Sequence, residues 1–358
     1  EIMHDGGHRF QRFMLWNAFV LLLNSPHAIA LSFPNVCTSR HEESSKIINN
    51  AVTRTTKKGK EFQHHTEEGF ASNIRAKAEA NSGKVFGSKS YMSAWRNWSL
   101  QAIEQVQTEL AFNLPVHVEV DHEATAQLQF ELGVGADKGL MPSFSNAGAR
   151  AGYALGFFRR SRLLADLLMD ALVSKTAFAK DLGAMFDSSG KKAQVVSIGG
   201  GPGYDFCSCA LVSVFYATVM KKTPRPLVNC KVFDYEDWSD LVAAMGVATK
   251  NTLGPEISER SSSFDEHSCE WGGRCDITLP LSHPSNTGVQ AVLASTDLFT
   301  CQYCVAENAA ALRGGSFCFF RELLAGCRPG AVLVLTETTH RLWPELADVV
   351  REVAAAEG

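Results

Sequence analysis

A glycine-rich turn carries the clearest chemical signal in this sequence of 358 residues. In the run AQVVSIGGGPGYDF (193–206), an apolar strand leads into the turn and then into a predicted helix. The turn contains Gly199, Gly201 and Gly203. Glycines permit positive φ and let a ligand approach the backbone, while the start of a helix presents free N–H groups. We therefore expect a polar ligand to bind here.

The spacing of these glycines distinguishes between possible ligands. A dinucleotide-binding turn has the pattern G-x-G-x-x-G, which would place Tyr204 where the third glycine or alanine belongs. The pattern here is G-x-G-x-G, and no Gly-Lys-Ser/Thr follows it, so a P-loop is excluded. An NAD-linked oxidoreductase stays an alternative, in which Asp234 would bind the adenosine ribose.

With this spacing, the sequence resembles the class I S-adenosylmethionine-dependent methyltransferases, whose first motif is an apolar strand followed by a G-x-G-x-G turn. The resemblance covers roughly residues 190–340 and implies that the turn binds the amino-acid end of S-adenosyl-L-methionine. In this family the position two before the first glycine is often acidic, and here it is Ser197. The resemblance thus implies cofactor contacts from Ser197, Gly199, Gly201 and Gly203.

Two aspartates at the ends of the next two predicted strands extend the resemblance. Asp234 ends the strand in CKVFDYEDW, where the family places an acid that accepts both ribose hydroxyls. A carboxylate suits such a bidentate contact. Asp276, in RCDITLPL, stands where the family often has an acid that accepts the adenine amino group. We expect both aspartates to bind the cofactor.

The sequence indicates less about the methyl acceptor than about the cofactor. Tyr303 and Glu307, at the end of a strand in TDLFTCQYCVAEN, are candidates to face a substrate, although a tyrosine in such a place is more often packed. The segment lacks the Asp/Asn-Pro-Pro-Tyr/Phe signature of amino-group methyltransferases. We identify no catalytic base, and a catalytically inactive module that only binds the cofactor stays a further alternative.

The cysteines indicate neither a metal site nor a disulfide framework. Cys301 and Cys304 have the two-residue gap of a zinc knuckle, but no second pair at a suitable spacing accompanies them. Nine of the ten cysteines lie after residue 200, several of them in apolar runs. We expect them to be reduced thiols that pack as small hydrophobic side chains.

The elements that must position the glycine turn alternate between strands and helices after Lys191. The predicted strands are 194–198, 230–234, 274–279, 298–305 and 331–337, and the helices are 205–220, 238–245, 287–294, 308–325 and 341–355. This alternation implies parallel pairing. We predict an α/β fold with a Rossmann-like, doubly wound and mostly parallel sheet behind an N-terminal helical layer. The edge strands of this fold are missing after Glu337, so we expect the natural chain to extend past Gly358.

The chain divides into four regions. Residues 1–37 contain the apolar run MLWNAFVLLL (14–23), which has the layout of a signal peptide or of a buried helix and is too short for a membrane span. A leader would direct the protein to the secretory pathway or an organelle; otherwise we expect a cytoplasmic protein. Residues 38–90 have few large apolar side chains and are predicted to be a low-order linker. Residues 91–190 show helical periodicity, and residues 191–358 form the cofactor-binding domain.

The charge distribution bears on the methyl acceptor. Residues 1–98 hold 13 Lys and Arg against 8 Asp and Glu, which leaves 21 against 30 in residues 99–358. An acidic domain offers little general attraction for nucleic acid. We therefore favour a small-molecule or protein acceptor over RNA, and interpret the basic run FFRRSR (157–162) as a solvated helix face. Neither the acceptor nor the oligomeric state follows from the sequence.

Overall fold

The computed structural model describes residues 17–22, 30–33, 88–116, 118–138, 142–173, 177–187, 191–220, 226–253, 267–337 and 341–357. Its strands are β1 (Asn17–Leu22), β2 (Ala30–Phe33), β3 (Ala193–Ile198), β4 (Val228–Asp234), β5 (Ser268–Arg274), β6 (Leu298–Gln302) and β7 (Val332–Glu337). They form one sheet with the order β2-β1-β7-β6-β3-β4-β5. The strands from β7 to β5 are all parallel. The predicted Rossmann-like α/β fold is thus confirmed.

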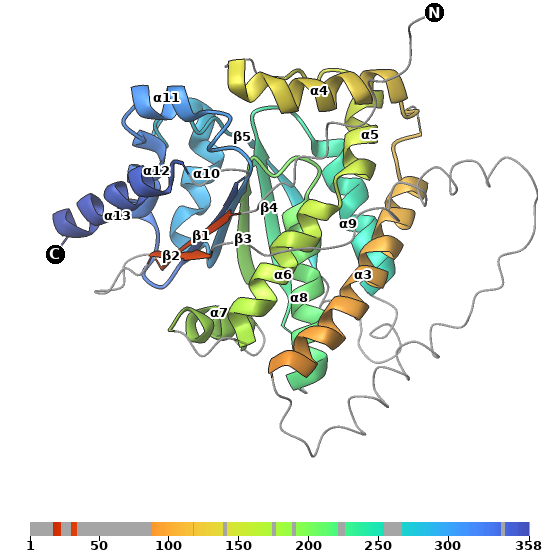
Figure 1. Ribbon diagram of the computed structural model, residues 1–358, viewed down its shortest axis with the longest axis horizontal. Coiled ribbons are helices and arrows are strands. Elements are labelled where there is room, and N and C mark those ends of the chain that lie inside the picture. Colours follow the sequence, from red (N-terminus) through yellow and green to blue (C-terminus); the bar gives the residue numbers. More distant parts are fainter. Residues whose placement is uncertain are drawn as a thin grey trace, which may run out of the picture.

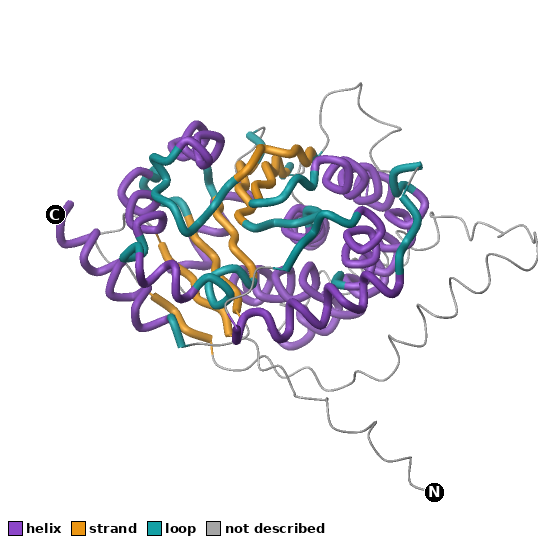
Figure 2. Tube along the Cα trace, turned by 90° about the horizontal axis from the view of Figure 1, so that it is seen from above, coloured by secondary structure: helices purple, strands orange, loops and turns teal. Residues whose placement is uncertain are grey.

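Helices cover both faces of this sheet (Figure 1). One face carries α3 (Ser88–Phe112), α6 (Arg159–Val173), α8 (Tyr204–Met220) and α9 (Ser239–Leu253). The other carries α10 (Thr287–Val292), α12 (Cys318–Gly326) and α13 (Trp343–Glu357). The described helices also include α4 (His122–Lys138), α5 (Ala147–Gly156), α7 (Ala177–Asp187) and α11 (Ala309–Gly314). Figure 2 shows the strands between these layers from a second direction.

Alternating side chains of the central strands supply the two hydrophobic cores. Along β3, Val195 packs under α8 and α9, whereas Val196 packs in the core under α12 and α13. Val334 and Leu335 of β7 divide between the two cores in the same way. Because successive strand residues point to opposite faces, a sheet covered on both sides needs apolar residues at nearly every position. This requirement explains the continuous apolar runs in the sequence.

The N-terminal segment completes the sheet, which corrects one expectation. β1 pairs with β7 in antiparallel register from Asn17 opposite Glu337 to Leu22 opposite Val332, and β2 pairs with β1. β7 is therefore not the edge of the sheet, and the expectation that the edge strands are missing is wrong. The alternative that this apolar run forms a buried helix is also wrong for residues 17–22. Cleavage of the segment as a leader stays a prediction.

The third predicted strand is displaced in the structure. β5 ends at Arg274, so most of the predicted segment 274–279 is a turn, in which Cys275 and Ile277 are buried. The ladder with β4 runs from Asn229 opposite Ser268 to Asp234 opposite Arg274 and contains a register shift. β5 lies at the end of the sheet and its residues alternate poorly in burial. Its apolar pattern is correspondingly weak, and the more apolar turn after it was mistaken for the strand.

Two predicted helical boundaries also change. The predicted helix 308–325 is two helices, α11 and α12, separated where Ser316 and Phe317 have positive φ. The glycine- and serine-containing segment 133–148 is typical of a loop, but α4 extends into it as far as Lys138. None of the helices in the described residues is long and apolar enough to cross a membrane.

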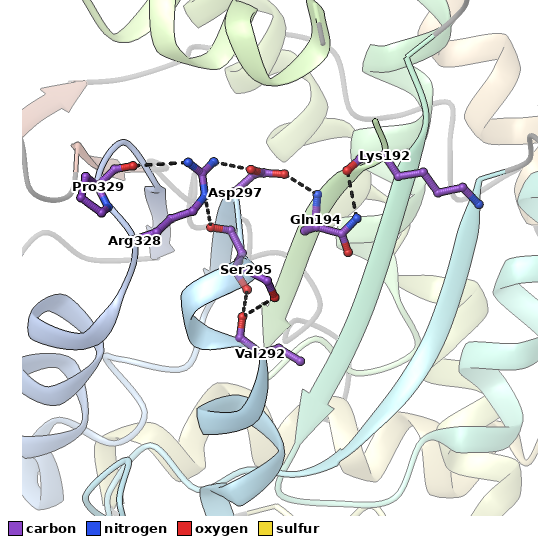
Figure 3. A network of polar contacts seen from close by, with 8 residues as sticks. Lys192, Gln194, Val292, Ser295, Asp297, Arg328 and Pro329 are labelled. Carbon is purple, nitrogen blue, oxygen red and sulfur yellow. Dashed lines mark hydrogen bonds and ion pairs between the residues drawn. The ribbon is translucent and has the colours of Figure 1, made fainter. Parts of the chain in front are cut away.

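A polar network fixes the end of the sheet opposite the glycine turn (Figure 3). The Asp297 carboxylate, just before β6, accepts a hydrogen bond from the backbone N–H of Gln194 at 2.7 Å and pairs with the Arg328 guanidinium. Arg328 also donates to the Thr296 carbonyl at 3.0 Å. These contacts join the starts of β3 and β6 to the turn before β7, which keeps the opposite ends of those strands aligned.

Candidate binding site at the glycine turn

The glycine turn lies where the order of the strands reverses. From β3 the chain continues to β4 on one side, whereas β6 lies on the other side of β3. In open α/β sheets, ligands bind outside the carboxyl ends of the strands at such a switch point. Gly199, Gly201 and Gly203 have φ values of +62°, +52° and +93° there. All three predicted glycines therefore adopt the conformation that other residues avoid.

Hydrogen bonds to the end of β4 hold the turn in place. The backbone N–H groups of Gly199 and Gly200 both donate to the Phe233 carbonyl, at 2.8 Å and 3.2 Å. The Gly201 N–H donates to Asp234 Oδ2 at 2.9 Å. A Cβ on Gly199 would lie 2.1 Å from Cys304 Sγ, whereas the nearest atom to a Cβ on Gly201 is in the Tyr153 ring at 3.9 Å. The turn is thus tightly packed at Gly199, whereas a side chain at Gly201 would be in ordinary contact with the Tyr153 ring.

Asp234 is the predicted ribose ligand, and the structure places it beside the turn. Its carboxylate is 5% exposed and accepts from the backbone N–H groups of Gly201 and Glu236. Burial raises the pKa of Asp234 to about 6. The enclosure comes from neighbouring rings: Tyr235 follows directly, and Phe144 packs edge-on against Tyr235 at 6.2 Å. A hydrogen bond of 3.0 Å from the Tyr235 hydroxyl to the Pro142 carbonyl ties this cover to the loop before α5.

Ser197 is fully buried and its hydroxyl is engaged within the protein. It donates to Asp205 Oδ2 at 2.7 Å, and Thr300 Oγ1 donates to the same oxygen at 2.5 Å. The Gln302 amide donates to the other carboxylate oxygen. Burial raises the pKa of Asp205. The acid expected two residues before the first glycine is thus replaced by a serine that contacts an aspartate in α8.

Asp276 lies two residues beyond the end of β5 and is partly exposed. Its Oδ1 accepts from the backbone N–H and the hydroxyl of Thr278, at 2.9 Å and 2.6 Å. Its own backbone N–H donates to the Asn286 side chain at 2.8 Å. These contacts fix the turn after β5, and Asp276 Oδ2 forms no hydrogen bond with the described residues of that turn. The three predicted acidic or polar ligands therefore differ in accessibility, with Asp276 the most exposed.

The loop after β6 forms the other wall of the switch point. Glu337 Oε1, at the end of β7, accepts from the N–H groups of Val305 and Ala306 at 2.5 Å and 3.0 Å and so fixes this loop. Tyr303 has a φ of +61°, and Glu307 is half-buried. Burial raises the pKa of Glu307 to about 7, and among the smaller effects the charge of Arg160 lowers this pKa and that of Asp234 raises it. Two carboxyl groups with raised pKa values, those of Asp234 and Glu307, therefore lie at the same end of the sheet.

The helical layer contributes residues that the sequence analysis did not assign to the site. The Arg160 guanidinium of α6 lies over the rings of Tyr153, Phe157 and Tyr303, at 5.3 Å, 5.4 Å and 4.5 Å from their centroids. Tyr153 and Phe157 stack at 4.6 Å. The interpretation of FFRRSR as a solvated helix face is therefore wrong for Arg160. The basic run itself was visible in the sequence, but nothing local indicated which arginine faces the turn.

Cys304, which lies beside the turn and next to Cys301, has a thiol with low reactivity. A hydrogen bond with Cys301 and burial raise the pKa of the Cys304 thiol well above its ordinary value. A thiol is a poorer nucleophile and metal ligand than a thiolate. The nine cysteines in the described residues are free. In the same part of the chain, no group of three or more His, Cys, Asp or Glu side chains is arranged to hold a metal ion.

Comparisons with known proteins give no match for this chain among family models, curated proteins or solved structures.

Proposed function

We propose that this protein is an S-adenosylmethionine-dependent methyltransferase whose cofactor binds at the glycine turn. The observation that supports the proposal most strongly is the turn of Gly199, Gly201 and Gly203, with positive φ at all three glycines, at the switch point of the sheet. An antiparallel pair of strands beside the parallel sheet, as β1 and β2 form here, also matches the edge that the family resemblance implies.

The chemistry of the site fits a cofactor that carries positive charge. Asp234 and Glu307 have pKa values raised to about 6 and about 7, because burial disfavours their charged forms. A positively charged group nearby would favour the carboxylates and lower both pKa values. S-adenosyl-L-methionine has a sulfonium and an ammonium group. Binding of this ligand would therefore make the charged forms of Asp234 and Glu307 more favourable.

The residues of the chain would bind and orient the reactants. In this proposal the cofactor lies against the backbone of the glycine turn, Asp234 would accept from its ribose hydroxyls, and Asp276 would accept from its adenine amino group. When bound, the cofactor supplies an activated methyl group, so that holding the acceptor in line is the main task of the protein. Asp234 is 5% exposed, so little water reaches its carboxylate.

The structure gives a reason to prefer this ligand over a dinucleotide. In the dinucleotide pattern, the third small residue permits close packing between helix and strand. Tyr204 stands at that position, is 2% exposed, and donates from its hydroxyl to the carbonyls of Tyr153 and Ala154 at 2.7 Å and 2.9 Å. A bulky ring at this position, which anchors α5, favours a mode of ligand binding that differs from that of a dinucleotide. For the acceptor we keep the preference for a small molecule or protein, because the net charge of residues 99–358 is negative.

Titration calorimetry with S-adenosylhomocysteine and with NADH on the full chain tests the proposal. We expect S-adenosylhomocysteine to bind and NADH not to bind. Binding of NADH alone would exclude the methyltransferase proposal. If S-adenosylhomocysteine binds, transfer of labelled methyl groups into RNA, protein and small-molecule fractions of a cell extract distinguishes an enzyme from an inactive binding module and identifies the class of acceptor.

A further inference from the structure

We propose that residues 142–146, the strap, form a gate over Asp234 that is closed in this structure and opens to let a ligand reach the carboxylate. The strap lies directly before α5 in the chain. The inference rests on the proposed function, because it requires a ligand that binds Asp234. It concerns how that ligand gains access to the site.

The burial of the strap alternates from residue to residue. Pro142 and Phe144 are buried, whereas Ser143, Ser145 and Asn146 are exposed. An extended segment shows this alternation when one of its sides faces the protein and the other faces water. The Phe144 side chain is 7% exposed. Phe144 is therefore the large inward side chain with which the strap closes the site.

Phe144 packs against aromatic rings that surround the end of β4. Its ring centroid lies 5.0 Å from that of Trp238, 5.3 Å from that of Tyr153 and 6.2 Å from that of Tyr235. Tyr235 and Trp238 follow Asp234 within four residues of the chain. Asp234 itself is 5% exposed. Two hydroxyl groups of one ligand cannot contact both oxygens of a carboxylate that has so little exposed surface.

The contacts that hold the strap are those of a gate and not of a fixed wall. The strap belongs to no helix and no strand. Its backbone accepts a hydrogen bond of 3.0 Å from the Tyr235 hydroxyl at Pro142 and one of 3.3 Å from the Arg150 side chain at Phe144. Segments without a regular backbone ladder open at a small fraction of the cost of global unfolding, and loops that cover binding sites are of this kind.

The start of α5 supplies a hinge for the strap. The Asn146 side chain caps the helix, because it accepts from the Ala149 N–H at 2.9 Å. Further along α5, the Tyr204 hydroxyl donates to the carbonyls of Tyr153 and Ala154 at 2.7 Å and 2.9 Å. The helix is thus fixed to α8, while the strap extends from its free end. Rotation of the backbone where the strap meets α5 is sufficient to open the gate.

Two variants weaken the closed position of the strap in different ways. Tyr235→Phe removes the hydroxyl that bonds to the strap but keeps the ring. Phe144→Ala removes the inward side chain. The matched controls are Tyr216→Phe, which removes a hydroxyl from α8, and Phe130→Ala, which removes a ring that is 62% exposed on α4.

The first measurement needs no ligand. Burial raises the pKa of Asp234 from 3.8 to about 6, and carbon-13 NMR of aspartate-labelled protein follows this titration. An open strap lets water solvate the carboxylate, which favours its charged form. Phe144→Ala should therefore lower the pKa of Asp234 toward 3.8. Tyr235→Phe should lower it less, and both controls should leave it near that of the natural protein.

The second measurement is the rate of S-adenosylhomocysteine binding, followed by stopped-flow tryptophan fluorescence on the full chain. If the gate must open first, the observed rate reaches a ceiling at high ligand concentration, which is the rate of opening. Tyr235→Phe should raise this ceiling by about twofold to tenfold, as expected for the loss of one hydrogen bond. Tyr216→Phe should not change it.

The proposal is overturned if the pKa of Asp234 is the same in the two strap variants as in the natural protein. It is also overturned if binding shows no ceiling, or if Tyr235→Phe leaves the ceiling unchanged. Should Phe144→Ala not fold, Tyr235→Phe decides by both measurements. Failure of the proposed function has a different signature, since S-adenosylhomocysteine then does not bind the natural protein. In that case the titration of Asp234 alone decides whether the strap covers this carboxylate.

Discussion

Glu307 makes the stability of the ligand-free protein depend on pH in a way that can be measured. Its ordinary pKa is 4.5, and in the folded protein it is raised to about 7, chiefly by burial. One pKa unit corresponds to about 1.4 kcal/mol, so the full shift corresponds to about 3 kcal/mol. Because the side chain is only partly buried, solvent screening reduces this figure, and we expect about 1–3 kcal/mol.

The sign follows from the direction of the shift. A carboxyl with a raised pKa in the folded state binds more protons folded than unfolded between about pH 4.5 and pH 7. Its contribution to stability is therefore fully present below pH 4.5 and is lost as the pH rises through 7. Glu307→Gln removes the charged form. The variant should therefore be more stable than the natural protein by about 1–3 kcal/mol at pH 8, and by about a quarter of that at pH 5.

Urea unfolding of both proteins at pH 5 and pH 8 measures this difference. Glu104→Gln is the matched control, because Glu104 is exposed on α3. The raised pKa already includes two opposing charge effects, the attraction of Arg160, which favours the charged form of Glu307, and the repulsion of Asp234, which disfavours it. An equal effect of Glu307→Gln at both pH values, or a loss of stability at pH 8, would refute the reasoning.

Three further predictions concern the turn, the buried network and the N-terminal strands. Gly201→Val should abolish binding of S-adenosylhomocysteine while leaving the far-UV circular dichroism near that of the natural protein, because φ at Gly201 is +52° and a side chain would occupy the backbone surface that the ligand is proposed to contact; retained affinity would show that the ligand binds elsewhere. Asp205→Ala should lower the free energy of unfolding by about 2–4 kcal/mol in urea titrations, since Ser197, Thr300 and Gln302 lose their acceptor; a cost no larger than that of Ser197→Ala would contradict the network. Removal of residues 1–37 should lower the melting temperature and promote self-association in analytical ultracentrifugation, because it exposes the edge of β7; an equally stable monomer would mean that β1 is dispensable.

Local sequence was sufficient for the features that depend on neighbouring residues. A short apolar run, a cluster of glycines and a helix start are adjacent in the chain, so β3, the turn at Gly199 to Gly203 and α8 were predicted nearly at their observed positions. Asp234 was placed correctly at the end of β4 for the same reason. The parallel sheet followed from the alternation of strands and helices, because such connections permit few topologies.

Other features were decided by contacts between distant residues. An apolar run of the length of 17–22 has the same local character in a leader, a helix or a strand, and only its pairing with β7, more than 300 residues later, makes it β1. β5 has little apolar alternation, so the ladder with β4 rather than its own composition sets its position.

The same difference between local and long-range contacts explains why some residues of the candidate site were predicted and others were not. The glycines and Asp234 were visible in the sequence because their roles rest on backbone conformation and strand ends. Arg160 was not, because one helix face looks like another until α6 packs beside the loop after β6 and brings its guanidinium over the Tyr303 ring. Ser197 shows the converse: its position in the motif is local, but the direction of its hydroxyl is set by Asp205 of α8, to which it donates in the buried interior.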